Sequence, residues 1–153
     1  MNNNHLIDLL QTDLRNERKH LGFYLQASVM VQGLHREELR EFFMEQAKDE
    51  LQHVAEFSEL IVHLGGVPEM GVSNFPSDGT DPVELLRYAA EMEQQVANTY
   101  ASRLVMTHEM ENAATAYAHV FYEEQIKDSQ HTAWEINQMV KTPWLGLKLG
   151  VEK

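Results

Sequence analysis

The sequence has no cysteine among its 153 residues. This absence excludes a disulfide scaffold, thiolate catalysis, a zinc finger and a cysteine-ligated iron–sulfur centre. It is consistent with a cytoplasmic protein, which is the localisation we expect. The N-terminal residues Met-Asn-Asn-Asn-His lack the basic region and apolar run of a secretory signal. No stretch approaches the roughly 18 apolar residues of a membrane-spanning helix, so we expect no span.

Basic residues are also scarce, because 12 Lys and Arg face 24 Asp and Glu, for a formal net charge of −12. Such a chain would repel the phosphates of a nucleic acid and the surface of an anionic membrane. A negative field instead raises the local concentration of cations. The charge balance therefore argues against nucleic-acid and membrane partners and favours a cation.

Glycine and proline are few, at 8 and 4, and most of them gather in residues 65–82 and 142–150. The stretches between are rich in Leu, Ala, Glu, Gln and Met, which favour helices, and none alternates as a strand would. We predict one domain over residues 1–153, with helices at 6–32, 36–64, 82–108 and 112–140. The connection at 65–81, about 17 residues, is long enough to travel the length of a helix. The sequence thus predicts an all-α four-helix bundle with one long crossover between its second and third helices, and a short tail after Pro143.

Each predicted helix carries an apolar stripe at alternating spacings of four and three residues, typical of a packed bundle. An acid interrupts each stripe near its middle: Glu17, Glu50, Glu93 and Asp128. Each of them lies about 11 to 14 residues from an end of its helix, or roughly 17–21 Å at 1.5 Å per residue. A buried carboxylate without a partner is costly, so four at one depth require a shared reason.

His53 follows Glu50 by three residues and therefore lies on the same helix face. Carboxylates combined with an imidazole suit iron or manganese, whereas zinc sites use more nitrogen or sulfur ligands. Two metal ions in such a layer need a bridging carboxylate, and Glu50 is the natural candidate. In the fourth helix a rival register would instead turn Glu124, Lys127 and His131 inward.

These motifs resemble the bacterial ferritins, both the non-haem ferritins and the bacterioferritins, over nearly the whole chain. The matching segments are Asn-Glu-Arg around Glu17 with Tyr24 seven residues on, residues 49–69, Ala-Ala-Glu-Met-Glu-Gln around Glu93, and Glu-Glu-Gln-Ile-Lys-Asp at 123–128. The resemblance implies a ferritin-like fold. It also implies Gln125 as a partner beside the ligands and Asp128 as the last ligand, which selects the first register of the fourth helix.

The di-iron interpretation assigns Glu17 and His53 to one Fe(II), Glu93 and Asp128 to the other, and Glu50 to both. Oxidation to Fe(III) by oxygen or peroxide would make the chain a ferroxidase, with Tyr24 as a candidate redox tyrosine near the iron. The family resemblance adds iron storage and detoxification, with ferric mineral held in a shell of 24 identical subunits.

Two departures from the family pattern change what is expected. Bacterioferritins bind haem through a Met directly after the helix-two Glu, and Leu51 stands there, so we expect no haem. They also repeat Glu-x-x-His on the fourth helix, where this chain has Gln125 and Asp128, so the second iron is expected to have only oxygen ligands. The other histidines, His20 among them, are predicted to be surface residues or hydrogen-bonded ones.

Two rival functions and one rival assembly remain open from the sequence. One function is a di-iron oxidase or peroxidase without storage, similar to rubrerythrin but lacking a rubredoxin domain. The other is a metal-free helical interaction module whose central acids make buried hydrogen bonds. A miniferritin of 12 subunits is disfavoured, because its site would lie between subunits and would not need four inward carboxylates.

Overall fold

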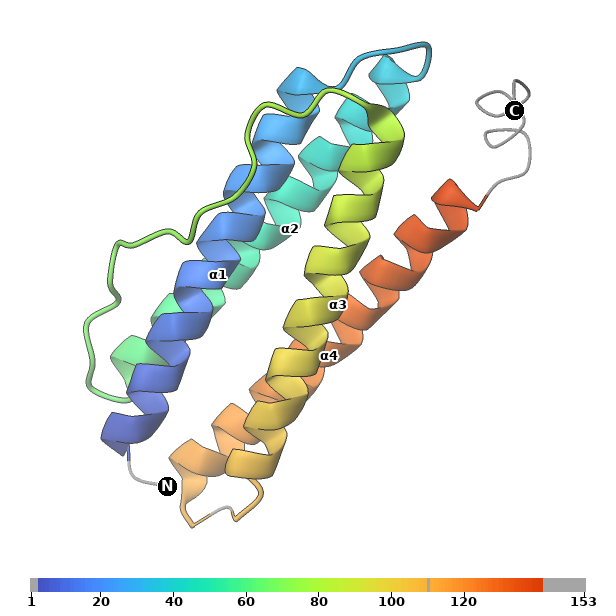
Figure 1. Cartoon of the computed structure of the whole chain (residues 1–153). Helices are drawn as coiled ribbons and strands as arrows, with labels where there is room; N and C mark the ends of the chain where they lie inside the picture. Colours follow the sequence, from blue (N-terminus) through green and yellow to red (C-terminus); the bar gives the residue numbers. More distant parts are fainter. Residues whose placement is uncertain (1–2, 110, 142–153) are drawn as a thin grey trace.

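The computed structural model describes residues 3–109 and 111–141, which form four α-helices and no strand. The helices are α1 (Asn3–Met30), α2 (Arg36–His63), α3 (Pro82–Met106) and α4 (Ala113–Val140). α1 packs against α2 and α3 packs against α4, and the two pairs form one bundle (Figure 1). The predicted all-α four-helix bundle is confirmed, with helix ends displaced by up to three residues. The predicted tail after Pro143 lies outside the described residues.

The helix ends follow from local capping chemistry. The Asp81 side chain accepts a hydrogen bond from the Glu84 amide, and Pro82 occupies the first turn, where its missing N–H costs nothing. Asn112 caps α4 in the same way, accepting from the Thr115 amide. α2 closes where the Gly65 amide bonds Val62 O and the Gly66 amide bonds Ile61 O, with Gly65 at a φ of 94°. That left-handed conformation favours glycine, so the sequence itself ends the helix there.

The crossover between α2 and α3 runs along the outside of α1 (Figure 1). Gln11 Nε2 donates to Val67 O at 2.8 Å, and Gln26 Nε2 donates to Ser77 O at 2.9 Å. Between these two points the Phe75 ring lies so close to Gly22 that a Cβ there would be 2.8 Å from it. The crossover is therefore held along α1, and it places the first residue of α3 at the end of the bundle where α1 ends.

The apolar core is divided into two clusters along the bundle. One cluster packs around Phe23, Phe43 and Leu86, and the other around Leu10, Phe57 and Tyr122. The buried residues between them along α1, α2 and α3 are polar. None of the described helices is both long enough and apolar enough to cross a membrane.

Candidate metal centre

The polar layer between the two apolar clusters brings together four of the predicted site residues. Glu17 on α1, Glu50 on α2 and Glu93 on α3 are buried, at 1%, 3% and 3% exposed. His53 lies one turn after Glu50 and is mostly covered, with 14% of its side chain exposed. Three helices therefore carry carboxylates into one interior layer, at the depth that the sequence predicted.

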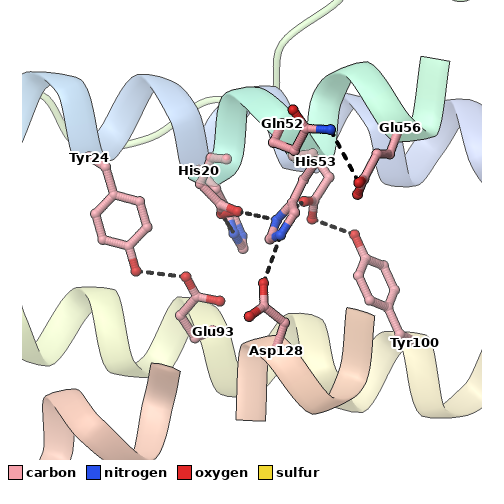
Figure 2. A network of polar contacts seen from close by, with 10 residues as sticks. His20, Tyr24, Gln52, His53, Glu56, Glu93, Tyr100 and Asp128 are labelled. Carbon is pink, nitrogen blue, oxygen red and sulfur yellow. Dashed lines mark hydrogen bonds and ion pairs between the residues drawn. The ribbon is translucent and has the colours of Figure 1, made fainter. Parts of the chain in front are cut away.

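His53 connects three acids. Its Nδ1 lies 2.6 Å from Glu50 Oε1 and 3.2 Å from Glu17 Oε1, and its Nε2 lies 2.7 Å from Asp128 Oδ2 (Figure 2). Carboxylate oxygens only accept hydrogen bonds, so both ring nitrogens donate when the imidazole is protonated. Asp128 is the outermost of these acids, since 53% of its side chain is exposed.

A further histidine belongs to this layer, and the sequence analysis did not place it there. His20 is 2% exposed, and its Nδ1 lies 3.1 Å from Glu50 Oε2. Spacings of four and three residues continue the stripe of the first helix from Glu17 to Leu21, whereas the buried face of α1 also includes His20. The signal was present, because Glu17-x-x-His20 repeats the spacing of Glu50-x-x-His53.

Two groups of three potential metal ligands result, and both include Glu50. The first is Glu17, Glu50 and His53, and the second is His20, Glu50 and Glu93. In each group the ligand atoms lie within 4.8 Å of one another. Among the described residues Asp128 belongs to neither group and contacts the first one through His53.

Two buried tyrosines bond the carboxylates in a crossed pattern. Tyr24 on α1 donates to Glu93 Oε2 on α3 at 2.7 Å, and Tyr100 on α3 donates to Glu17 Oε2 on α1 at 2.5 Å. Figure 2 shows the two rings at opposite ends of the cluster, both pointing inward. Burial and the nearby carboxylates raise the pKa of both hydroxyls well above 10, so they stay neutral donors. Each tyrosine thus fixes one carboxylate oxygen and leaves the other facing the centre.

The fourth helix presents Gln125, rather than Glu124, to the interior. Gln125 is 5% exposed while Glu124 is exposed, in agreement with the first of the two predicted registers. Both residues line a pocket of about 370 Å³ that reaches His53, together with Glu56, Asp128 and His131. This pocket, whose lining also includes Lys127, connects the centre with the protein surface between α2 and α4.

Without metal, protons compensate the acids of the centre. Burial would raise the pKa of Glu50, but hydrogen bonds from His20 and His53 outweigh it and lower that pKa to about 2. Burial and then the charge of Glu50 raise the pKa of Glu17, and the same two causes raise that of Glu93 to about 8. Burial would lower the pKa of His20, yet its bond to Glu50 raises it to about 9. At neutral pH the cluster therefore holds protons on both histidines and on Glu93.

The residues present fit a pair of cations such as iron. Among the described residues Glu17 Oε1 makes no well-aligned hydrogen bond, and its ion-pair contact is with His53 Nδ1 at 3.2 Å, a nitrogen that lies closer to Glu50 Oε1, at 2.6 Å. Carboxylates with imidazoles are the ligand set that suits iron and manganese. Leu51, which carries no donor atom, is 58% exposed, and the expectation that no haem binds stays a prediction.

Fold and site together define a class, the four-helix bundles that hold a carboxylate–histidine centre between their helices. The chain belongs to the ferritin-like domain family, whose model matches residues 7–143. No curated protein matches the sequence. Similar solved structures include a ferritin-like diiron-carboxylate protein of Bacillus anthracis str. Ames, 25% identical with a TM-score of 0.81, over 90% of this chain and 96% of that one.

Two more distant structures share the fold. Mycobacterium tuberculosis bacterioferritin BfrA is 22% identical with a TM-score of 0.81, over 97% of this chain and 89% of its own. A dodecameric thioferritin of Bacteroides fragilis is 22% identical with a TM-score of 0.65, over 92% and 91% of the two chains. The predicted family is confirmed, and one of these relatives is described as a dodecamer.

Proposed function

We propose that this chain is a cytoplasmic ferroxidase and iron store, which oxidises Fe(II) at a two-iron site inside each subunit. The observation that carries the proposal is the pair of three-ligand groups sharing Glu50, both complete within one chain. The proposed ligands are Glu17 and His53 for one Fe(II), Glu93 for the other, and Glu50 for both. Asp128 stays the predicted fifth ligand, at the mouth of the site beside His53.

The chain's own residues would bind the substrate, orient it and keep it apart from bulk water. Two Fe(II) lose one electron each, and one peroxide molecule takes both electrons with two protons to give two waters. Dioxygen would likewise take two electrons and two protons to give peroxide. Carboxylate oxygens favour Fe(III), the harder ion, so the ligand set favours the oxidised product. Tyr24 and Tyr100 hold Glu93 and Glu17 in place throughout.

The pocket beside His53, in which three carboxylates outnumber one lysine, supports a route for Fe(II) into the site. Its carboxylates at Glu56, Glu124 and Asp128 lie between the outer surface and a ligand that is only 14% exposed. Acidic groups in a concave surface concentrate a cation near the opening. Fe(II) would therefore reach His53 first and pass Asp128 on the way.

The storage part of the proposal needs a closed assembly of subunits, which the family resemblance suggests contains 24 chains. The intrasubunit position of both ligand groups supports this assembly over one whose sites lie between subunits. Light scattering combined with iron loading tests it. We expect a particle of 24 chains that takes up far more iron than two ions per chain. A 12-chain particle that stores iron corrects only the size, whereas a monomer or dimer that stores none favours the rubrerythrin-like alternative.

The ferroxidase part is tested by removing the shared ligand. Glu50→Ala should abolish the rapid phase of Fe(II) oxidation, because losing the bridge disables both ions. Loss of a residue that only hydrogen-bonds a ligand costs about 10–100-fold, so we expect more than about 100-fold here. Glu45→Ala is the matched control, since Glu45 lies on the same helix with its side chain 62% exposed. Stopped-flow absorbance measures the rate and circular dichroism checks the helices; a Glu50→Ala variant that oxidises Fe(II) at the parent rate refutes the proposal.

A further inference from the structure

We infer that His20 is the nitrogen ligand of the second iron, so that each of the two irons is held by one imidazole. The inference rests on the proposed two-iron function and adds a ligand to it. The centre would then consist of Glu17 and His53 on one side, His20 and Glu93 on the other, and Glu50 between them. This differs from the sequence-based expectation of only oxygen ligands around the second iron.

The two oxygens of Glu50 support this division. Oε1 lies 2.6 Å from His53 Nδ1, and Oε2 lies 3.1 Å from His20 Nδ1. A carboxylate that bridges two ions directs one oxygen to each, and here each oxygen already faces a different imidazole. A cation on each side of Glu50 would therefore be shared between one of its oxygens and one imidazole.

The surroundings of His20 fit a ligand better than a packing residue. It is 2% exposed and shares its layer with Glu50 and Glu93, and the charges of three carboxylates bear on it. Its ligand nitrogen and one oxygen of each of these two acids lie within 4.8 Å of one another. Three donors from three different helices converge at this point, which a single hydrogen bond to Glu50 does not require.

The same Glu-x-x-His spacing occurs on two antiparallel helices, α1 and α2. Glu17-x-x-His20 on α1 and Glu50-x-x-His53 on α2 each place an acid and an imidazole on one face. Because α1 packs against α2, the two faces meet in the same layer. Asp128 on α4 is then not needed to complete the second site, and it contacts His53 at the opening.

The test uses Co(II), which does not oxidise under the conditions, as the probe. Crystals of the assembled protein are soaked without oxygen in graded Co(II), and anomalous diffraction measures the occupancy of each site. In the parent protein we expect two peaks, with a His20 ring nitrogen at roughly 2.0–2.2 Å from the second, as for first-row metal–imidazole bonds. His20→Gln keeps a hydrogen-bond donor toward Glu50 but not the imidazole, and it should empty the second peak at concentrations that still fill the first.

Two matched variants complete the experiment. His53→Gln should empty the first peak, and His119→Gln should leave both filled, because His119 is bonded to Thr107 at the far end of the bundle. Calorimetric Co(II) titration should show the second binding step of His20→Gln weakened at least about tenfold. If that variant does not fold, the His20–Co(II) distance in the parent crystals decides.

The outcomes separate this inference from the function on which it rests. A parent protein that binds no Co(II) and no Fe(II) refutes the two-iron proposal itself. The assignment of His20 alone is overturned if the parent protein fills two sites but both His20 nitrogens lie more than about 3 Å from either ion, well beyond a metal–imidazole bond. It is also overturned if His20→Gln binds both ions as the parent does.

Discussion

Two clusters of buried acid lie next to each other in this bundle, and they differ in what compensates the charge. In the Asp13 cluster (Asp13, Arg103 and Tyr122), Arg103 donates to both carboxylate oxygens at 2.8 and 2.7 Å, and Tyr122 donates to Oδ2 at 2.5 Å. Both oxygens of Asp13, a residue with no exposed surface, therefore have partners.

The candidate metal centre (Glu17, His20, Glu50, His53 and Glu93), called the metal centre below, has no arginine or lysine partner among the described residues. Three buried carboxylates face two histidines, and within the described part of the chain Glu17 Oε1 has only a 3.2 Å ion-pair contact with His53 Nδ1. Imidazoles lose their protons far more readily than a guanidinium does. Burial alone therefore does not distinguish a metal ligand from a structural acid. The distinguishing feature is that the negative charge of the metal centre is compensated by protons, which a metal ion can displace, and not by an arginine.

The two clusters are joined by their tyrosines. Tyr100 bonds Glu17 in the metal centre, Tyr122 bonds Asp13, and the two rings are 5.3 Å apart. The Asp13 cluster thus supports the ring that orients one ligand of the metal centre. We therefore expect substitutions in the Asp13 cluster to reduce the free energy of unfolding, and substitutions in the metal centre to reduce metal binding.

The largest expected effect on stability comes from removing Arg103. Arg103→Met leaves the Asp13 charge buried without its cation, and breaking a buried ion pair in this way costs about 3–5 kcal/mol. Denaturant unfolding of the metal-free protein measures the loss. The double variant Asp13→Asn with Arg103→Met should recover a large part of it, because no charge is then left unpaired. An unfolding free energy unchanged by Arg103→Met would mean that the two clusters do not differ as described.

A moderate effect is expected from pH on the metal-free protein. The pKa of His20 is raised from 6.5 to about 9, so the stability from its proton is complete below pH 6.5 and is lost as the pH rises through 9. The pKa of Glu93 is raised from 4.5 to about 8, so its contribution makes stability fall as the pH rises from 4.5 to 8, where the unfolded chain has lost this proton and the folded chain has not. The melting temperature in chelator should therefore fall between pH 6.5 and 9.

Glu93→Gln isolates the contribution of that acid. Its melting temperature should fall less steeply over the same pH range, because glutamine has no proton to lose. Glu91→Gln, at an exposed neighbouring position, should follow the parent protein. If the melting temperatures of all three proteins fall equally steeply with pH, the proton on Glu93 does not contribute to stability and this explanation is wrong.

The smallest effect is expected at Asp128. Its side chain is 53% exposed and contacts the centre only through His53 among the described residues. Asp128→Asn should weaken Co(II) binding less than His20→Gln does, and both affinities come from the same calorimetric titration. A larger loss at Asp128 would restore the sequence-based assignment of Asp128 to the second iron over His20.

Much of the bundle was predictable because its signals are local. Helix-forming composition, the caps at Asp81 and Asn112 and the glycines after α2 fix the four helices within a few residues. The period of the apolar stripes also predicted that Glu17 and Glu50 lie inside.

The positions of other buried residues could not be predicted from the sequence, because they depend on how wide the buried face of a helix is and on contacts with residues far away in the chain. A buried face covers more than a single seam, so His20 is inside beside the predicted stripe, and Leu21 is only partly buried. Asp13 is paired with Arg103, 90 positions along the chain, and no spacing within one helix predicts that contact. Asp128 lies at the predicted depth, but the rotation of α4 leaves it half exposed.

Anaerobic Fe(II) binding by equilibrium dialysis tests the central claim most directly, because it counts the ions that replace the protons. The account predicts two Fe(II) per chain in the parent protein and in Asp13→Asn, and loss of both ions in Glu50→Ala. A parent protein that binds no Fe(II), or a Glu50→Ala variant that still binds two, would contradict it.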